Sequence, residues 1–145
     1  MPVHTNADVD SLSTANTDDL GYVGEAIQGV VRALAGKVPV IHFGTGASGF
    51  FRELHAAGGD VMGVDWRVNI DQAWTDISYR SAVEGNLDPV ALFAPLRELK
   101  MKIAELLKRT GTRPGHIFNV GHGILPETPV ENVKACVEMV REFKL

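Results

Sequence analysis

His122 is the side chain whose type and setting most clearly indicate chemistry. It lies between two glycines, in the segment His-Ile-Phe-Asn-Val-Gly-His-Gly-Ile-Leu-Pro that spans residues 116–126. An apolar run that leads into a glycine-flanked polar residue is typical of a strand that delivers one group to the mouth of an α/β fold. An imidazole in that position can donate or accept a proton near neutral pH. His122 is therefore the first candidate for a catalytic residue.

Other polar side chains also follow apolar runs. Asp65 ends one such run and Arg67 comes two residues later, while Asn86 ends another and is followed by Asp88. Asp65 is suited to orienting a substrate, and the Arg67 guanidinium is suited to holding a carboxylate. Asn86 and Asp88 also suit a turn and a helix cap, and His42 suits a core or rim position. We predict Asp65, Arg67 and Asn86 as substrate-binding residues.

Apolar runs alternate with helical patterns along the chain. The patterns predict strands at residues 38–43, 60–65, 82–86 and 116–120, and helices at 18–35, 50–57, 69–77, 89–110 and 130–140. This alternation predicts a parallel sheet with right-handed crossovers, either doubly wound or curved as part of a barrel. Both architectures place functional groups at the carboxyl ends of the strands, where the candidate residues lie.

Local signals predict where several helices begin. Thr17, followed by two aspartates, is the expected N-cap of the first helix. Asp88 and Pro89 form the expected N-cap and first position of a long helix that ends near Thr110. Residues 128–131, Thr-Pro-Val-Glu, match a capping box for the last helix. Its expected apolar stripe comprises Val130, Val133, Val137 and Val140.

The composition describes one ordinary domain. The chain has 145 residues, 45% of them hydrophobic, a formal net charge of −4 and a single cysteine, Cys136, which we expect to act as a small buried hydrophobe. No secretory signal, membrane span, disulfide framework or metal-binding spacing is evident, which predicts a soluble, cytoplasmic protein without a metal. The scattered basic residues argue against a nucleic-acid partner. We expect residues 1–16 to be a flexible N-terminal arm and residues 17–145 to be the single domain.

The glycines at residues 44–49 allow a second interpretation. Gly-Thr-Gly-Ala-Ser-Gly fits the pattern G-x-G-x-x-G between a predicted strand and helix, and Asp65 follows one β–α unit later. In a dinucleotide site, such glycines let the backbone approach a pyrophosphate and the acid binds a ribose hydroxyl. The alternative is that the glycines only form a tight turn between a strand and a helix.

Four segments, taken in order, resemble the C-terminal half of the uroporphyrinogen decarboxylase family. They are Val-Pro-Val-Ile-His-Phe-Gly-Thr-Gly at 38–46, Ala-Gly-Gly-Asp-Val-Met-Gly-Val-Asp-Trp-Arg at 57–67, Glu-Gly-Asn-Leu-Asp-Pro at 84–89, and residues 116–126. The resemblance implies the fold of a (βα)8, or TIM, barrel and a lyase of heme biosynthesis that decarboxylates uroporphyrinogen without a cofactor. It places the family's active-site histidine at His122.

Residues 21–39 are similar to an earlier helix and strand start of the same family. Here they run directly into the later segment, as though the chain were spliced near Val38–Ile41 with the β–α units between them absent. The family's arginine-bearing motif, which holds substrate carboxylates, and its strand-end aspartate, which contacts the pyrrole nitrogens, are not found. A decarboxylase needs groups that stabilise the transition state, and these are its principal ones.

The expected fold is therefore a (βα)4 half of a TIM barrel with an extra N-terminal helix. Half of a barrel has two unpaired edges and an apolar inner face, so we expect a homodimer that closes eight strands. The expected function is a self-associating relative of the decarboxylase with little or no turnover, which still admits a porphyrinogen or other anionic small molecule. The alternatives are an active decarboxylase in a dimer-closed barrel and a dinucleotide-binding protein.

Overall fold

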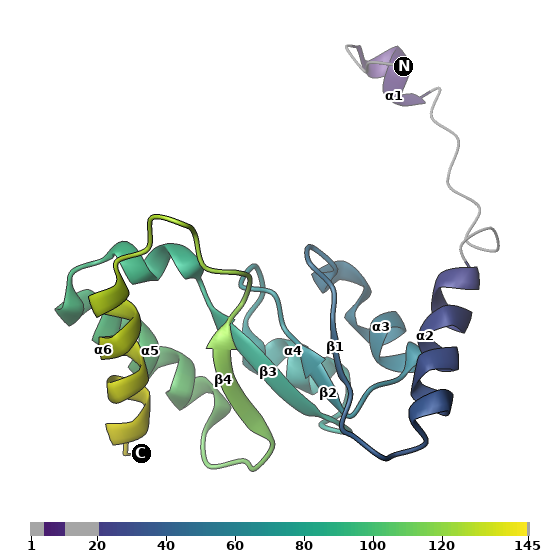
Figure 1. Ribbon diagram of the computed structural model, residues 1–145. Helices are drawn as coiled ribbons and strands as arrows, with labels where there is room; N and C mark the ends of the chain where they lie inside the picture. The colour runs from purple at the N-terminus through teal and green to yellow at the C-terminus, as the bar shows by residue number, and fades with distance from the viewer. Residues whose placement is uncertain (1–4, 11–20, 145) are drawn as a thin grey trace.

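The structure is a computed structural model that describes residues 5–10 and 21–144. The expected N-cap Thr17 lies outside these residues. In chain order the elements are α1 (Asn6–Asp10), α2 (Gly21–Leu34), β1 (Ile41–Phe43), η2 (Ser48–Phe50), α3 (Phe51–Ala57), β2 (Val61–Gly63), α4 (Ile70–Asp76), β3 (Ala82–Leu87), η3 (Pro89–Phe93), α5 (Leu96–Thr110), β4 (His116–Val120) and α6 (Val130–Glu142). The predicted alternation of strands and helices is confirmed (Figure 1).

The four strands form one parallel sheet in the order β1-β2-β3-β4. The registers pair Phe43 with Gly63, Gly63 with Glu84, and Asn86 with Asn119. Each strand lies beside the next one in the chain, because each connection contains a helix that returns the chain to the same end of the sheet. The result is an α/β fold consistent with part of a TIM barrel.

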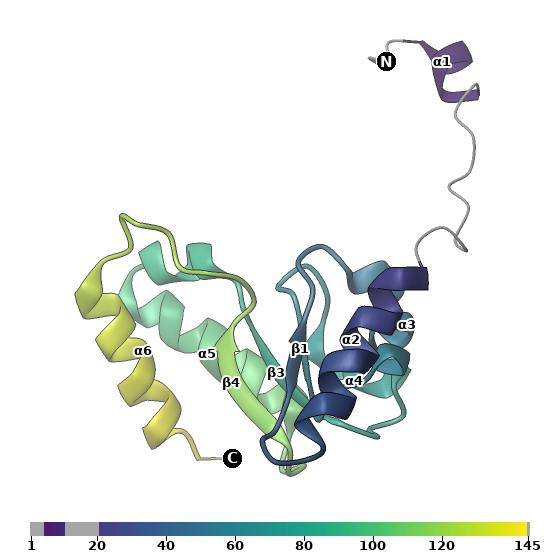
Figure 2. The same cartoon turned by 45° about the vertical axis from the view of Figure 1, so that its right-hand side comes forward.

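The helices cover one face of the sheet (Figures 1 and 2). Met62 of β2 and Val83 of β3 are fully buried on this face and pack with Ile70 and Trp74 of α4. A second core cluster lies under α5 and joins Leu87, Leu99, Ile103 and other residues. Because side chains alternate between the two faces of a strand, the neighbours of these core residues point to the opposite face.

The opposite face has no helix over it in the part of the chain that the structure describes. Its apolar side chains stay partly exposed: Ile41 by 49%, Phe43 by 44% and Ile117 by 44%. The Phe43 ring lies against Gly63 of the neighbouring strand, and a Cβ atom at position 63 would be 2.6 Å from its Cδ2 atom. The sheet therefore has one buried face and one apolar face that remains open.

The helical segment after β3 differs from the one expected. The long helix predicted from Pro89 is divided into η3 and α5 at Ala94 and Pro95. Pro95 lacks an N–H and restricts the residue before it, so a continuous helix cannot pass through this position. Asp88 does cap η3, since its carboxylate accepts a hydrogen bond from the Val90 N–H at 2.9 Å.

The capping box predicted for the last helix is wrong. Pro129 occupies the cap position of α6, which makes no side-chain cap hydrogen bond, and the buried hydroxyl of Thr128 has no hydrogen-bond partner among the described residues. The predicted valine stripe is only partly buried, with Val130 65% exposed and Val137 45% exposed. Cys136 is instead the buried residue of α6, as its expected role as a small hydrophobe requires.

Part of the predicted N-terminal arm is helical. Asn6–Asp10 forms α1, in which the Thr5 hydroxyl accepts a hydrogen bond from the Asp8 N–H at 3.2 Å and the Asp8 carboxylate accepts one from the Thr5 N–H at 2.8 Å. This reciprocal pair is a capping box that the sequence reading missed. No helix in the described ranges is both long and apolar enough to cross a membrane.

We expect Met62→Ala to lower the free energy of unfolding by roughly 2–5 kcal/mol, because it leaves a cavity in the core under the sheet. Met101 of α5 is 56% exposed and provides a matched control. Its replacement by alanine should change the free energy of unfolding by less than about 0.5 kcal/mol. Urea denaturation of both variants measures the difference, and equal losses would contradict the assigned core.

Candidate functional site

The buried carboxylate of Asp65 connects the carboxyl ends of the strands. Its Oδ2 atom accepts hydrogen bonds from the Gly46 N–H at 2.8 Å and from the Arg67 Nη1 at 2.6 Å. Its Oδ1 atom accepts one from the Arg67 N–H at 2.8 Å. The side chain is only 1% exposed. Asp65 therefore holds the loop after β1 to the loop after β2.

The surroundings of Asp65 act on its pKa in opposite directions. Burial raises the pKa of the carboxyl group, but the hydrogen bonds from Gly46 and Arg67, together with the charge of the Arg67 guanidinium, lower it by more. The net result is a pKa below the ordinary value of 3.8. The carboxylate is thus ionised at neutral pH and is stabilised by the groups that it positions.

Asn86 extends these contacts to β3. Its side-chain amide donates hydrogen bonds to the Asp65 carbonyl at 3.1 Å and to the Val68 carbonyl at 2.6 Å. It follows a cis peptide bond between Gly85 and Asn86, and the residue is 8% exposed. Asn86 therefore joins the end of β3 to the loop after β2, and substrate contact by this residue stays a prediction.

Arg67 is held on two sides at the same edge of the sheet. Besides its bond to Asp65, its guanidinium carbon lies 4.7 Å from the centre of the Trp66 ring. The side chain is 48% exposed. A guanidinium that is held flat by an aromatic ring and a carboxylate keeps its remaining N–H groups available to an anion.

Gly121 positions the loop that carries His122. Its N–H donates a hydrogen bond to the Leu87 carbonyl at 2.8 Å, and its carbonyl accepts one from the Trp66 N–H at 3.4 Å. A Cβ atom at position 121 would overlap the backbone of Trp66. Only glycine allows the β4 loop to approach the β2 loop this closely. This contact fixes the position of the backbone next to His122.

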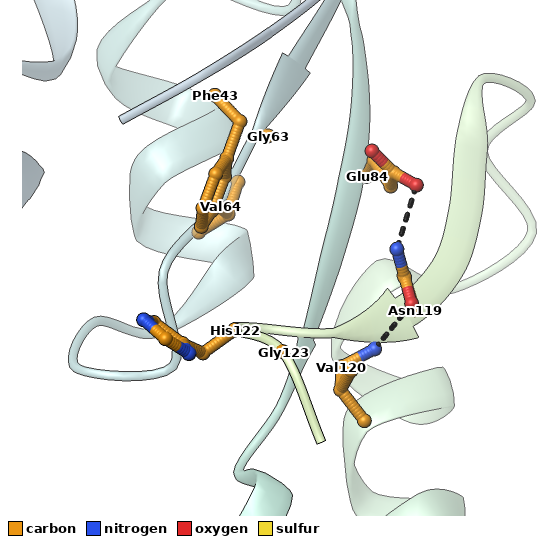
Figure 3. Close-up of a pocket in the computed structure, with 8 residues that line it drawn as sticks. All are labelled: Phe43, Gly63, Val64, Glu84, Asn119, Val120, His122 and Gly123. Carbon is orange, nitrogen blue, oxygen red and sulfur yellow. Dashed lines mark hydrogen bonds between the residues drawn. The ribbon is translucent and has the colours of Figure 1, made fainter. Parts of the chain in front are cut away.

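His122 is exposed and lines a pocket on the open face of the sheet (Figure 3). The pocket has a volume of about 360 Å³. Its lining residues are Phe43, Gly63, Val64, Glu84, Asn119, Val120, His122 and Gly123. The His122 ring has no hydrogen-bond partner in the part of the chain that the structure describes, so both ring nitrogens are open to a ligand.

The other histidine of this segment has a structural role. His116 begins β4, and its Nε2 atom donates a hydrogen bond to the Gly85 carbonyl at 2.8 Å. Burial lowers the pKa of His116, and the bond to Gly85 opposes that effect only in part. His116 therefore favours the neutral form and braces β3 against β4.

Glu84 is a titratable residue of the pocket that was not among the candidates from the sequence. Its Oε1 atom accepts a hydrogen bond from the Asn119 side-chain amide at 2.8 Å, and Asn119 in turn accepts one from the Val120 N–H at 2.8 Å. Figure 3 shows this chain of bonds along one side of the pocket. An acidic residue inside an otherwise apolar strand segment is unusual, and this feature of the sequence could have identified Glu84.

The predicted site residues form two groups. In one group, Asp65 bonds to Arg67 through its carboxylate and to Asn86 through its carbonyl. None of these three residues lines the His122 pocket. Asn86 instead lines a smaller hollow of about 200 Å³ beside α4 and α5. No lysine or arginine lines the His122 pocket as described. Within the described residues, no cluster of His, Cys, Asp and Glu side chains suits a metal ion.

The glycine loop does not have the arrangement that a dinucleotide site needs. The Gly46 N–H, which would face a pyrophosphate, donates to Asp65. Asp65, which would bind a ribose, is buried and accepts bonds from its own chain through both oxygens. The loop is a turn between β1 and α3 that the carboxylate of Asp65 stabilises.

We expect Asp65→Asn to lower the free energy of unfolding at pH 7 by about 1–3 kcal/mol, because an amide cannot accept hydrogen bonds at both of its heavy atoms. Since folding lowers the pKa of Asp65, its contribution is present above the ordinary value of 3.8 and is lost as the pH falls through the folded value. The difference between wild type and variant should therefore shrink below about pH 4.

Asp71→Asn is the matched control, because Asp71 is 47% exposed and contacts Arg109 only at 3.5 Å. Its effect on the free energy of unfolding should stay below about 1 kcal/mol. Urea denaturation at several pH values measures both variants. A pH-independent difference for Asp65→Asn would contradict the role assigned to its charge.

Comparison with known proteins identifies the relatives of this chain. The sequence profile described as "Uroporphyrinogen decarboxylase (URO-D)" matches residues 22–143. The uroporphyrinogen decarboxylase of Solibacter usitatus is 51% identical over 243 positions, which cover 99% of this chain and 70% of that protein. The corresponding protein of Carboxydothermus hydrogenoformans is 55% identical over 106 residues, or 73% of this chain and 30% of its own length.

These alignments also show how much of the relatives is represented. The Solibacter alignment is 243 positions long and the chain has 145 residues, so an internal part of that relative has no counterpart here. The chain spans 38% of the uroporphyrinogen decarboxylase of Chloroflexus aggregans, to which it is 47% identical.

A solved structure supports the fold. A methyltransferase from Methanosarcina mazei superposes with a TM-score of 0.69 at 21% identity, over 82% of this chain and 35% of that one. The order of the strands, the pocket at their carboxyl ends and the match of the sequence over nearly its whole length lead to one assignment. The chain belongs to the uroporphyrinogen decarboxylase family.

Proposed function

We propose that this chain is a half-barrel member of the uroporphyrinogen decarboxylase family that associates with itself and has little or no decarboxylase turnover. The observation that carries the proposal is the composition of the His122 pocket. It offers an imidazole, a carboxylate and an amide beside apolar walls, but no cationic side chain among its described lining residues. Uroporphyrinogen carries many carboxylates, and a pocket without a cation does not hold the reacting carboxylate in a fixed position, even where the molecule binds.

The chemistry explains why one histidine is not sufficient. Decarboxylation breaks a carbon–carbon bond, releases carbon dioxide and leaves an electron pair on the side-chain carbon, which then takes up a proton. Groups that accelerate this step must hold the reacting carboxylate and stabilise the positive charge that develops on the pyrrole ring of the substrate. His122 supplies a polar group, while Arg67, the cation predicted to hold a substrate carboxylate, is bound to Asp65. Positioned groups of this kind act together, so a partial set supports little turnover.

The same residues support binding of an anionic small molecule. His122 is open to the pocket, and Arg67 has N–H groups that its bond to Asp65 and its contact with Trp66 leave available. Asp65 and Asn86 act in this proposal by holding the loops that carry these two side chains. No cofactor is part of the proposal.

The open face and the open edges of the sheet support self-association. β1 and β4 each pair with one neighbour in the sheet, so their outer edges have no strand partner among the described residues. A two-fold axis parallel to the strands would place β1 of one copy beside β4 of the other in the parallel sense, and both edges would pair at once. The helices that flank these edges, α2 and α6, also expose apolar side chains, among them Tyr22, Val23, Val30, Val130 and Val137.

We expect uroporphyrinogen to remain unchanged when it is incubated anaerobically with the protein, because the pocket lacks a group that fixes the reacting carboxylate. We expect His122→Ala to raise the dissociation constant for uroporphyrin by about tenfold, which corresponds to one hydrogen bond to a charged group. Product chromatography measures turnover, and quenching of porphyrin fluorescence measures binding.

His55→Ala is the control for His122→Ala, because His55 belongs to α3, does not line the His122 pocket, and bonds to Ser81 at 3.0 Å. Its replacement should leave porphyrin affinity unchanged. Accumulation of decarboxylated products with the wild type would favour an active dimer-closed enzyme instead. Equal affinities for wild type and His122→Ala would remove the binding role of that residue.

We expect the wild type to be a dimer at micromolar concentration and Phe43→Asp to be a monomer, because the added charge lies on the open apolar face. Phe50→Asp is the matched control, since Phe50 is 66% exposed and lies in η2, outside the strands. Light scattering gives the mass of each protein. A monomeric wild type, or a Phe43→Asp variant that still forms dimers, would contradict the proposed association.

A further inference from the structure

Glu84 is the acid of the open face. Apart from the histidines, it is the only residue of the four described strands with an acidic or basic side chain. Its partner Asn119 belongs to the neighbouring strand β4 and is itself fixed by the Val120 N–H. The carboxylate is therefore held in place beside the apolar groups of this face, and its Oε2 atom has no partner among the described residues.

The surroundings of Glu84 contain little charge. Phe43 faces the pocket from β1, Gly63 from β2, and Asn119 and Val120 from β4, and none of these can be charged. The loop after β4 contributes His122, which is the other titratable side chain in the lining. Glu84 therefore contacts the Asn119 amide, and His122 lies elsewhere in the lining of the same pocket.

The strand order determines where a second copy would place its own Glu84. This step rests on the dimer of the proposed function. In a closed barrel with the order β1-β2-β3-β4 repeated twice, each β3 is four strands from its copy, directly across the barrel. An eight-stranded barrel has an interior just wide enough to be filled by side chains, which come in layers from alternate strands. The two Glu84 side chains would therefore point at each other.

We propose that the second copy completes a shared interior in which the two Glu84–Asn119 pairs face each other, and that closure of the barrel is coupled to proton uptake by this pair of carboxylates. Two carboxylates that are withdrawn from water and brought together cannot both stay ionised without a large cost. A proton shared between them removes the repulsion and supplies a hydrogen bond. The Glu84 pair thus makes the association of the two copies dependent on pH.

The test is the dimer dissociation constant from sedimentation or light scattering at pH 5 and pH 8. We expect the wild type to associate at least about tenfold more tightly at pH 5, because association takes up protons. Glu84→Gln keeps the shape of the side chain and removes the acid, so it should associate about equally at both pH values and more tightly than the wild type at pH 8.

Two further variants separate Glu84 from other causes. Glu98→Gln removes one acid from the exposed surface of α5 and should keep the pH dependence of the wild type. His122→Asn removes the other titratable group of the pocket and should also keep it. Loss of the pH dependence in either variant would overturn the proposal, because the acid of the open face would not be its cause.

The outcomes also distinguish this proposal from the dimer on which it rests. A wild type that is monomeric at both pH values would overturn both. A dimer that Phe43→Asp disrupts, but that has the same dissociation constant at pH 5 and pH 8, would leave the proposed association intact and overturn the role of Glu84.

Discussion

The buried carboxylate of Asp65 is the interaction on which the functional edge of this molecule depends. It lies at the end of a core strand, where its charge would be costly without partners. Two backbone N–H groups and a guanidinium satisfy it, and those donors come from the loops after β1 and β2. Its own carbonyl accepts a bond from Asn86 at the end of β3. One residue thus fixes the relative positions of three strand ends.

The fourth strand joins this network through the backbone. Trp66, the next residue after Asp65, donates to Gly121, and Gly121 donates to Leu87 at the end of β3. His122 follows immediately, so its position depends on contacts that begin at Asp65. The geometry of the pocket is therefore a property of the connected loops, even though Asp65 itself does not line the pocket.

The two faces of the sheet have different chemical characters, and this difference bears on function. The face that packs on the helices contains the core, with Met62, Leu99 and Val83 fully buried. The open face carries the pocket, with a carboxylate, an amide and a histidine beside exposed apolar groups. The polar and titratable groups that line the pocket therefore lie on the face that no described helix covers.

Sequence patterns predicted the strands because each strand is a short apolar run bounded by glycine, proline or polar residues. They also placed Asp65, Asn86 and His122 at the correct ends of the strands. The contact between Asp65 and Gly46 was not predictable, because it joins loops 19 residues apart and depends on the register of β1 and β2. Glu84 was missed for a related reason. Strands of a parallel sheet are usually buried on both faces. Glu84 can be assigned to an exposed face only once the structure shows that one face of this sheet is uncovered.

Local signals were less reliable where two of them competed. Pro89 favoured the start of one long helix, but Pro95 interrupts it, so that a short helix, η3, precedes α5. Thr128 was expected to cap α6 with its hydroxyl group. Pro129 took the cap position instead, and the Thr128 hydroxyl was left buried without a partner among the described residues.

The two tryptophans of the chain lie in contrasting environments, with consequences for spectroscopy. Trp74 is 2% exposed and donates its indole N–H to the Ser81 carbonyl, so its emission reports on the core. Trp66 is 39% exposed and stacks against the Arg67 guanidinium at the edge where the strand ends meet. The protein therefore contains one intrinsic fluorophore at the rim where the strand ends meet and a second in its interior, and replacing either one separates the two signals without an added label.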